Sequence, residues 1–139
     1  MALGIAIGVE RVLVHKEAGV KTHALVSLGA AAFVVISELV AVKYVGLGDF
    51  DPTRIASQII VGVGFLGAGS IILQDNRLHG LTTAGGLWVT AGVGMAAGFG
   101  LFSLASILTF LILMIFILIN ILEKPIKKYS DSTIGKDSR

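Results

Sequence analysis

The chain has 139 residues, of which 55% are hydrophobic and 14% are charged, and its mean hydropathy is +0.90. A water-soluble domain of this length cannot bury so much apolar surface, so the composition indicates an integral membrane protein. The lack of cysteine excludes disulfides, thiol catalysis and cysteine-ligated metals. The net charge of +2 comes with lysines near the C-terminus, which we interpret as the flank of a membrane span and not as a nucleic-acid surface.

Five apolar segments predict an all-α fold, a polytopic membrane bundle of about five transmembrane helices. The first segment, residues 1–14, is short for the hydrocarbon core, which takes roughly 20 helical residues to cross. It is either a half-span or a truncated helix, and its abrupt start in a Gly/Ala-rich run favours truncation. The other segments cover residues 23–45, 53–73, 81–98 and 101–122.

Basic residues are distributed unequally among the predicted loops. If five helices alternate, nine lysines and arginines fall on one side of the membrane and only Lys43 and Arg54 on the other. Because basic loops stay in the cytoplasm, the pattern predicts a multi-pass protein with a cytoplasmic C-terminus. Residues 1–124 are expected to form the transmembrane domain, and residues 125–139 a polar, disordered cytoplasmic tail.

A charged turn at residues 51–54 precedes the third span. Asp51 suits the N-cap of a helix, and this structural role alone is enough to explain it. A functional alternative follows from the helical period of 100° per residue. Asp51, Gln58, Gly62 and Gly69 fall on one side of the helix and form a polar and then small-residue stripe, with Arg54 beside it. This stripe would line either a water-filled crevice, in which Asp51 meets a metal cation, or a helix-packing seam with a polar mouth.

Glycines are frequent in the third and fourth spans. A glycine inside a helix costs about 1 kcal/mol relative to alanine in water, whereas in a bilayer it lets helix backbones approach closely. We therefore expect the third helix to be central, and Gly62→Leu or Gly67→Leu to destabilise the protein by overpacking. The glycines expected to make close helix contacts are Gly62, Gly64, Gly67, Gly69 and Gly92.

Two other acidic positions are candidates for function. Glu10, beside Arg11, is interpreted as part of a structural charge cluster at the interface in preference to a proton relay, because a carboxylate in the membrane needs a partner. Glu38 lies toward the outer end of the second span. It is either an interfacial carboxylate or part of an acidic cluster with Asp49 and Asp51 that attracts divalent cations.

The remaining polar residues give no catalytic pattern. No nucleophile, base and acid occur at a supporting spacing, so the chain is not expected to be an enzyme. The histidines are not at zinc-ligand spacing, and those at 15, 23 and 79 are expected to be hydrated. Thr82 and Thr83 are expected to cap the fourth helix, and Asn120 to form a hydrogen bond near the membrane interface.

Four stretches of the chain resemble the MgtC/SapB family of bacterial inner-membrane proteins, in its short SapB-like branch without a C-terminal soluble domain. They are GIAIGVER (4–11), AGVKTHALVSLGAA (18–31), DPTRIASQIIVGVGFLGAGSII (51–72) and GLTTAGGLWVTAGVG (80–94). The resemblance implies a five-helix membrane domain and roles in growth at low magnesium and, in pathogens, in survival inside host cells. It also maps the family's important acidic residue onto Asp51, its Glu-Arg pair onto Glu10 and Arg11, and its glutamine onto Gln58.

Two functions from different classes stay open. The first is a regulator that binds another membrane complex, for which the resemblance suggests the F-type ATP synthase. The second is a channel or transporter for divalent cations, with Asp51, Glu38 and Gln58 along the path. A purely structural homo-oligomer is a third, weaker reading. The expected surroundings are the lipid bilayer, with transiently bound Mg²⁺ as the only expected ligand and no nucleic acid.

Overall fold

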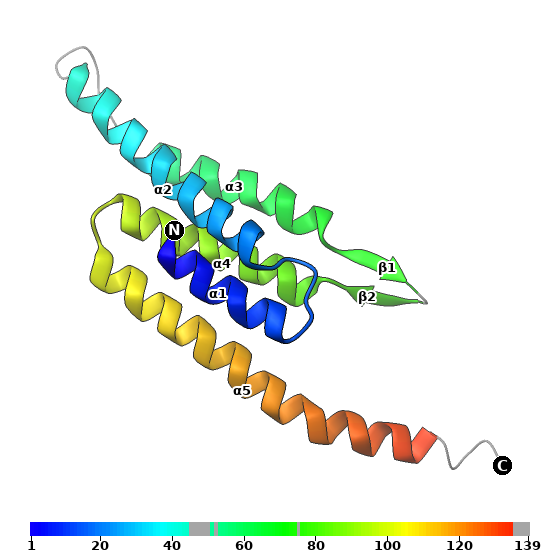
Figure 1. The fold of residues 1–139 in the computed structure, drawn as a ribbon. Helices are drawn as coiled ribbons and strands as arrows, with labels where there is room; N and C mark the ends of the chain where they lie inside the picture. Colours follow the sequence, from blue (N-terminus) through cyan, green and yellow to red (C-terminus); the bar gives the residue numbers. More distant parts are fainter. Residues whose placement is uncertain (45–50, 52, 75, 135–139) are drawn as a thin grey trace.

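The computed structural model describes residues 1–44, 51, 53–74 and 76–134, with side chains as far as residue 122. Each of the five predicted apolar segments forms a helix, and a short β-hairpin lies between the third and the fourth (Figure 1). In chain order the elements are α1 (Ala2–Leu13), α2 (Val20–Lys43), α3 (Thr53–Gly69), β1 (Ile72–Gln74), β2 (Arg77–His79), α4 (Leu81–Gly98) and α5 (Phe102–Ile134).

The fold is mostly helical, as predicted, and a short β-hairpin that the sequence analysis did not predict follows α3. Helix α3 ends at Gly69, where the Ser70 hydroxyl and backbone N–H both donate to the carbonyl of Gly67, at 2.7 and 3.0 Å. These bonds satisfy a carbonyl that the helix leaves free, which favours termination there. The chain then forms two antiparallel strands with Leu73 opposite Leu78, and Asn76 has a left-handed φ of 60° that suits a short turn.

Helices α2 and α5 are long and apolar enough to cross a membrane. The qualifying helices are Val20–Lys43 and Phe102–Leu122, in which the most apolar 18 residues have a mean hydropathy of 2.3 and 2.8. The apolar helix α3 has 17 residues, and α1 has 12. Length and composition therefore support two spans, and the five-span bundle remains a prediction. Helix α5 continues past Leu122 and through Pro125 to Ile134, into the region predicted to be disordered, because a proline bends a helix without always ending it.

Helix α4, and not α3, is the central helix of the bundle. It packs against α1, α2, α3 and α5 (Figure 1). Eight of its residues are buried, compared with three in α3, namely Ile59, Val63 and Gly67. Those three lie four residues apart and form a single stripe, so α3 contacts the bundle through one face. The prediction that α3 is central is therefore wrong.

The closest contacts between helix backbones involve two glycine pairs that the sequence analysis did not single out. A Cβ at Gly94 would lie 2.2 Å from the carbonyl oxygen of Ser27, and a Cβ at Gly8 would lie 2.5 Å from the Cα of Val20. Both contacts press on α2, one from α4 and the other from α1. Each glycine has a partner four residues away with a similarly close contact, as in G-x-x-x-G helix pairs. These partners are Gly98 and Gly4.

The glycines that were expected to pack closely mostly do not. Within the described part of the chain, a Cβ at Gly62, Gly64, Gly69 or Gly92 would have no heavy atom within 4 Å. Only Gly67 meets a neighbouring helix, with a Cβ position 3.5 Å from the Ala84 backbone oxygen. The reason is that the Ile59–Val63–Gly67 stripe faces the bundle, and the other α3 glycines lie off this stripe.

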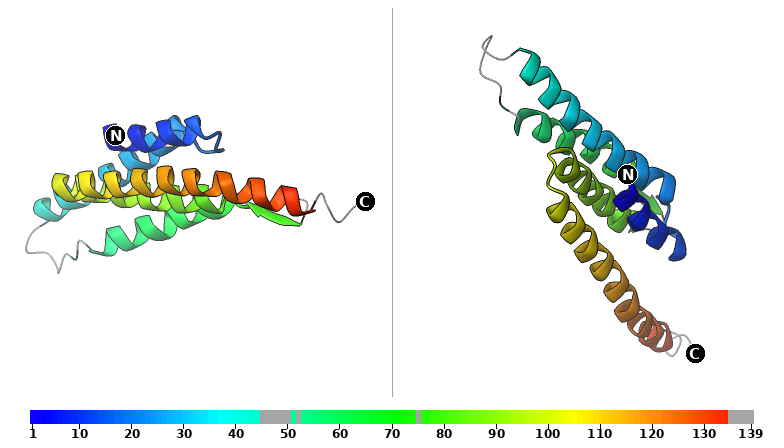
Figure 2. Two further views of the ribbon diagram at one scale, coloured as in Figure 1. Left: turned by 90° about the horizontal axis from the view of Figure 1, so that it is seen from below. Right: turned by 60° about the vertical axis from the view of Figure 1, so that its left-hand side comes forward.

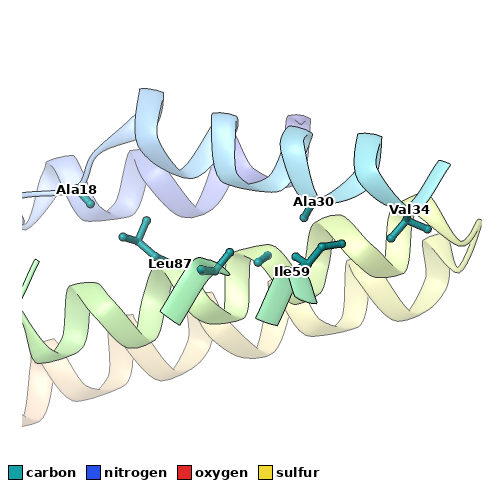
Figure 3. Packing of buried hydrophobic residues seen from close by; sticks show 7 residues of the cluster. Ala18, Ala30, Val34, Ile59 and Leu87 are labelled. Carbon is teal, nitrogen blue, oxygen red and sulfur yellow. The ribbon is translucent and has the colours of Figure 1, made fainter. Parts of the chain in front are cut away.

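Two apolar clusters flank α4. One joins α2, α3 and α4, and Figure 3 shows Val34 and Ile59 among the side chains that meet there. The other lies among α1, α4 and α5 and includes Ile7, Val93 and Ile112. Figure 2 shows α1 and α3 on opposite sides of the plane of α4 and α5. The bundle therefore has an α1 side and an α3 side, which differ in their polar content.

Candidate functional site

Buried polar side chains gather where α1, α2, α4 and α5 meet. This is the end of the bundle that carries the loop after α1, the hairpin and the later part of α5 (Figure 1). A polar group inside an apolar bundle is costly unless it has partners, so each of these residues raises the question of what it contacts. The buried polar residues at this end are Glu10, Arg11, His23, Thr83 and Thr90.

Glu10 and Arg11 form an ion pair between adjacent residues of α1. The Nε of Arg11 donates to Oε2 of Glu10, and the Nδ2 of Asn120 donates to Oε1 at 3.0 Å. Both carboxylate oxygens thus have a donor, and one comes from a helix that lies 110 residues further along the chain. This geometry is that of the structural charge cluster expected from the sequence, with Asn120 as an additional partner.

The guanidinium of Arg11 also lies over an aromatic ring. Its Cζ is 3.4 Å from the centre of the Phe116 ring on α5, and the side chain is 1% exposed. Arginine stacks on aromatic faces in this way because its planar cation is weakly hydrated. Glu10 and Arg11 therefore connect the end of α1 to α5 by a hydrogen bond and a cation–π contact, while their ion pair lies within α1.

His23 on α2 is fully buried and contacts α4. Its Nδ1 lies 2.9 Å from the Oγ1 of Thr90, and this hydroxyl donates to the carbonyl of Gly86 at 2.7 Å. A hydroxyl has one hydrogen, so Thr90 accepts from a protonated Nδ1. The expectation of a hydrated histidine is wrong for His23, because the small residue Gly86 lets the ring fit between α2 and α4, 3.5 Å from its Cβ position.

Thr83 attaches the loop after α1 to α4. Its hydroxyl donates to Oε2 of Glu17 at 2.9 Å. The pKa of Glu17 is lowered first by its own backbone N–H and then by this hydroxyl, with smaller contributions from Lys16 and His79. The predicted threonine cap is wrong for Thr83, because α4 begins after Gly80, whose φ of 86° and close approach to the backbone of Ser70 leave no room for a side chain. Thr82 is exposed and makes no cap hydrogen bond either.

Asp51 lies at the other end of the bundle and has the local role that its sequence position predicts. Its Oδ1 accepts from the backbone N–H of Thr53 at 2.9 Å and from the Thr53 hydroxyl at 2.6 Å. These two bonds, with a smaller effect of Arg54, lower the pKa of Asp51. The carboxylate is exposed and ionised at neutral pH, and it stabilises the first turn of α3.

The other candidates of the predicted cation site stay apart. Arg54, Glu38 and Gln58 are exposed, and among the described residues no three acidic or histidine side chains are close enough to hold a metal. Asp49, the third member of the predicted acidic cluster, lies outside the described residues. Gln58 instead lines a groove between α2 and α3.

An apolar groove separates α2 from α3 and has a volume of about 810 Å³. Gly29 of α2 and Gly62 of α3 face it from opposite sides, and neither has a heavy atom within 4 Å of its Cβ position. Gln58 is its main polar group. Its lining also includes Leu25, Phe33, Ile36, Val40 and Leu66.

Comparison with known proteins supports the resemblance. The model of the MgtC family matches residues 1–125. The "Putative magnesium transporter YhiD" of Escherichia coli K12 is 43% identical over 119 residues, which cover 80% of this chain and 54% of that protein. "Protein MgtC" of Brucella abortus is 46% identical over 124 residues (89% and 48%), and that of Salmonella typhimurium 39% over 136 residues (98% and 56%). The chain spans about half the length of these relatives, and no solved structure matches it.

Proposed function

Because the chain belongs to the MgtC family, we propose that it is a bacterial inner-membrane regulator, which binds a transmembrane helix of another membrane complex and adjusts magnesium-linked ion and energy homeostasis. Its C-terminus lies in the cytoplasm, as the distribution of basic residues predicts. The link to magnesium comes from the name of the Escherichia coli relative, "Putative magnesium transporter YhiD". The F-type ATP synthase is the candidate complex that the family resemblance suggests.

The groove between α2 and α3 is the observation that carries this proposal. Its lining on α2 runs from Leu25 to Val40, which corresponds to about 22 Å along the helix. That length covers most of a hydrocarbon core of about 30 Å. Gly29 and Gly62 leave their backbones accessible from within the groove, and such small residues allow a further helix to approach closely. A transmembrane helix therefore fits it in both length and surface.

The contacts of the acidic side chains agree with a regulator better than with an ion pathway. Glu10 is neutralised by Arg11 and hydrogen-bonded by Asn120, so its carboxylate is engaged in holding the helices together. Asp51 is engaged in capping α3. The groove, by contrast, is apolar and offers contact surface in place of ion ligands.

Site-specific crosslinking in living cells tests the proposal. Phe33 lines the groove and Phe110 lies on the outer surface of α5, and the two are 60% and 66% exposed. Each is replaced in turn by p-benzoylphenylalanine. We expect Phe33, and not Phe110, to crosslink to one defined membrane protein. Gly62→Leu should abolish both this crosslink and growth at low magnesium, while the unfolding temperature of the purified protein stays within a few degrees of the parent.

Three outcomes would contradict this function. Crosslinks from Phe33 to lipid alone would mean that the groove holds acyl chains. Crosslinks only to a second copy of the chain would support the structural oligomer. Loss of growth without loss of the crosslink in Gly62→Leu would separate the groove from the physiological role.

A divalent-cation transporter is the second candidate. It is favoured by the ionised, exposed carboxylate of Asp51 and by the name of the Escherichia coli relative, "Putative magnesium transporter YhiD". Purified protein in liposomes containing a Mg²⁺-sensitive dye distinguishes the two functions. Influx of Mg²⁺ that Asp51→Asn abolishes would support transport, whereas equal signals from empty and protein-containing liposomes would exclude it.

A further inference from the structure

A second pocket, of about 380 Å³, lies on the α1 side of the bundle, between α4 and α5. The two helices diverge from the turn that joins them (Figure 1). The residues that line the pocket lie away from this turn, in the first half of α4 and from Ile112 onward in α5. Its polar lining consists of Arg11, Lys16, Thr82 and Asn120. None of these residues contributes to the groove between α2 and α3.

Arg11 gives the pocket an incompletely used cation. Its Nη2 is buried and lacks a hydrogen bond of acceptable geometry, although it lies close to the same Glu10 oxygen that Nε contacts. Lys16 provides a second cation in the same wall. Arg11 and Lys16 are the charged side chains of the lining, and the carboxylates near them, Glu10 and Glu17, lie outside it. The Nη2 donor, an ammonium, an amide and a hydroxyl together form a set that binds the oxygens of a phosphate group.

The rest of the pocket is apolar and follows α5 toward the middle of the span. Ile112, Ile115 and Ile119 line it on α5, over about 10 Å of helix. Ile115 and Ile119 are about half-exposed, so the wall is open to the surroundings of the bundle. Asn120 lies near the end of the apolar stretch Phe102–Leu122, which places the polar part of the pocket where a lipid headgroup would be.

We propose that this pocket binds an anionic phospholipid. The phosphate contacts Arg11, Lys16 and Asn120, and an acyl chain lies along the isoleucines of α5. A free phosphate shares the chemistry of the polar end and makes no use of the apolar wall. Basic pockets between membrane helices commonly hold anionic headgroups, and each lysine near such a surface contributes about fivefold in affinity.

Native mass spectrometry of the full chain, released from nanodiscs, tests the proposal. The nanodiscs contain phosphatidylglycerol and phosphatidylcholine in equal amounts. The measurement is made without inorganic phosphate and again with phosphate in about 10-fold excess over the protein. We expect one phosphatidylglycerol to be retained preferentially. Lys16→Gln should reduce this preference about fivefold. Lys21→Gln is the matched control, because it removes an exposed cation at the start of α2, five residues from Lys16 and outside the pocket.

Each outcome supports or overturns the proposal. Preference for phosphatidylglycerol that phosphate does not displace, and that Lys16→Gln but not Lys21→Gln weakens, supports a lipid site. Displacement by phosphate would assign the pocket to a soluble anion and overturn the lipid. Equal retention of both lipids, or equal losses in the two variants, would also overturn it. Arg11→Lys keeps the charge but removes the planar donor set, so an unchanged preference in this variant would contradict the role of Nη2.

Discussion

The α1 side and the α3 side of this bundle use glycine in opposite ways. On the α1 side, Gly8 and Gly94 bring α1 and α4 against the backbone of α2, and buried polar side chains bridge the same helices. On the α3 side, Gly29 and Gly62 face each other across a groove between α2 and α3 and have no heavy atom within 4 Å of their Cβ positions. The same residue type therefore closes one face and opens the other. The difference depends on which side of each helix faces a neighbour, and not on the number of glycines.

Neutralising a carboxylate should lower the free energy of unfolding much more at a buried position than at an exposed one, and this is the largest effect that we expect. Glu10→Gln leaves the guanidinium of Arg11 buried without its counter-charge, and we expect the free energy of unfolding to fall by about 3–5 kcal/mol. Glu38→Gln changes an exposed residue of α2 and should change the free energy of unfolding by less than about 0.5 kcal/mol. Unfolding of both variants in detergent, followed by circular dichroism, measures the two values. Similar losses of stability in the two variants would contradict the structural role of the buried Glu10.

Adding one methyl group should separate the two kinds of glycine. In Gly94→Ala the new Cβ would lie 2.2 Å from the Ser27 carbonyl oxygen, so α2 and α4 must move apart at a cost of about 2–3 kcal/mol. Gly62→Ala meets no atom within 4 Å and should keep or slightly raise the unfolding temperature, since alanine favours helix. A loss of stability in Gly62→Ala as large as in Gly94→Ala would show that α3 is packed more tightly than the groove implies.

The smallest change in stability is expected from a change of pH. The pKa of Glu17 in the folded state lies below its ordinary value of 4.5, so its ionised form stabilises the fold above pH 4.5, and this contribution is lost as the pH falls through the lowered pKa. Thr83→Val removes one cause of the shift and should reduce the fall in unfolding temperature between pH 6 and about pH 3.

Thr53→Val is the counterpart for Asp51, whose pKa lies below 3.8. The Thr53 bonds are local, because they join residues two apart, whereas the Glu17–Thr83 bond joins residues 66 apart. Thr53→Val should therefore affect the start of α3 and leave the main unfolding transition less changed. A larger effect at Thr53 than at Thr83 would reverse this order.

Local patterns in the sequence were read more reliably than distant ones. Asp51 caps α3 as its position before Thr53 predicts, since capping needs only neighbouring residues. The helices follow the apolar segments for the same reason. The hairpin was missed although Asn76 precedes β2, because the apolar residues at 71–73 continue the pattern of α3. The family, identified from four sequence stretches, is confirmed by the family match over residues 1–125.

The choice of the central helix depended on distant contacts and was wrong. Counting glycines favoured α3, whereas the four-residue spacing of Gly4 with Gly8 and of Gly94 with Gly98 marks the helices that pack closely. That spacing was available in the sequence. The contact of Asn120 with Glu10 was not, because nothing near either residue specifies the other. An amide side chain near the end of the apolar span of α5 indicated only that a partner was needed.

The hydrogen bond from Asn120 to Glu10 also sets an order of assembly. During synthesis at about 5–20 residues per second, Asn120 emerges roughly 5–20 s after Glu10. Throughout that interval the adjacent Arg11 is the only one of these partners that can neutralise the carboxylate. Helix α1 therefore gains its full set of contacts around Glu10 only after α5 has been synthesised.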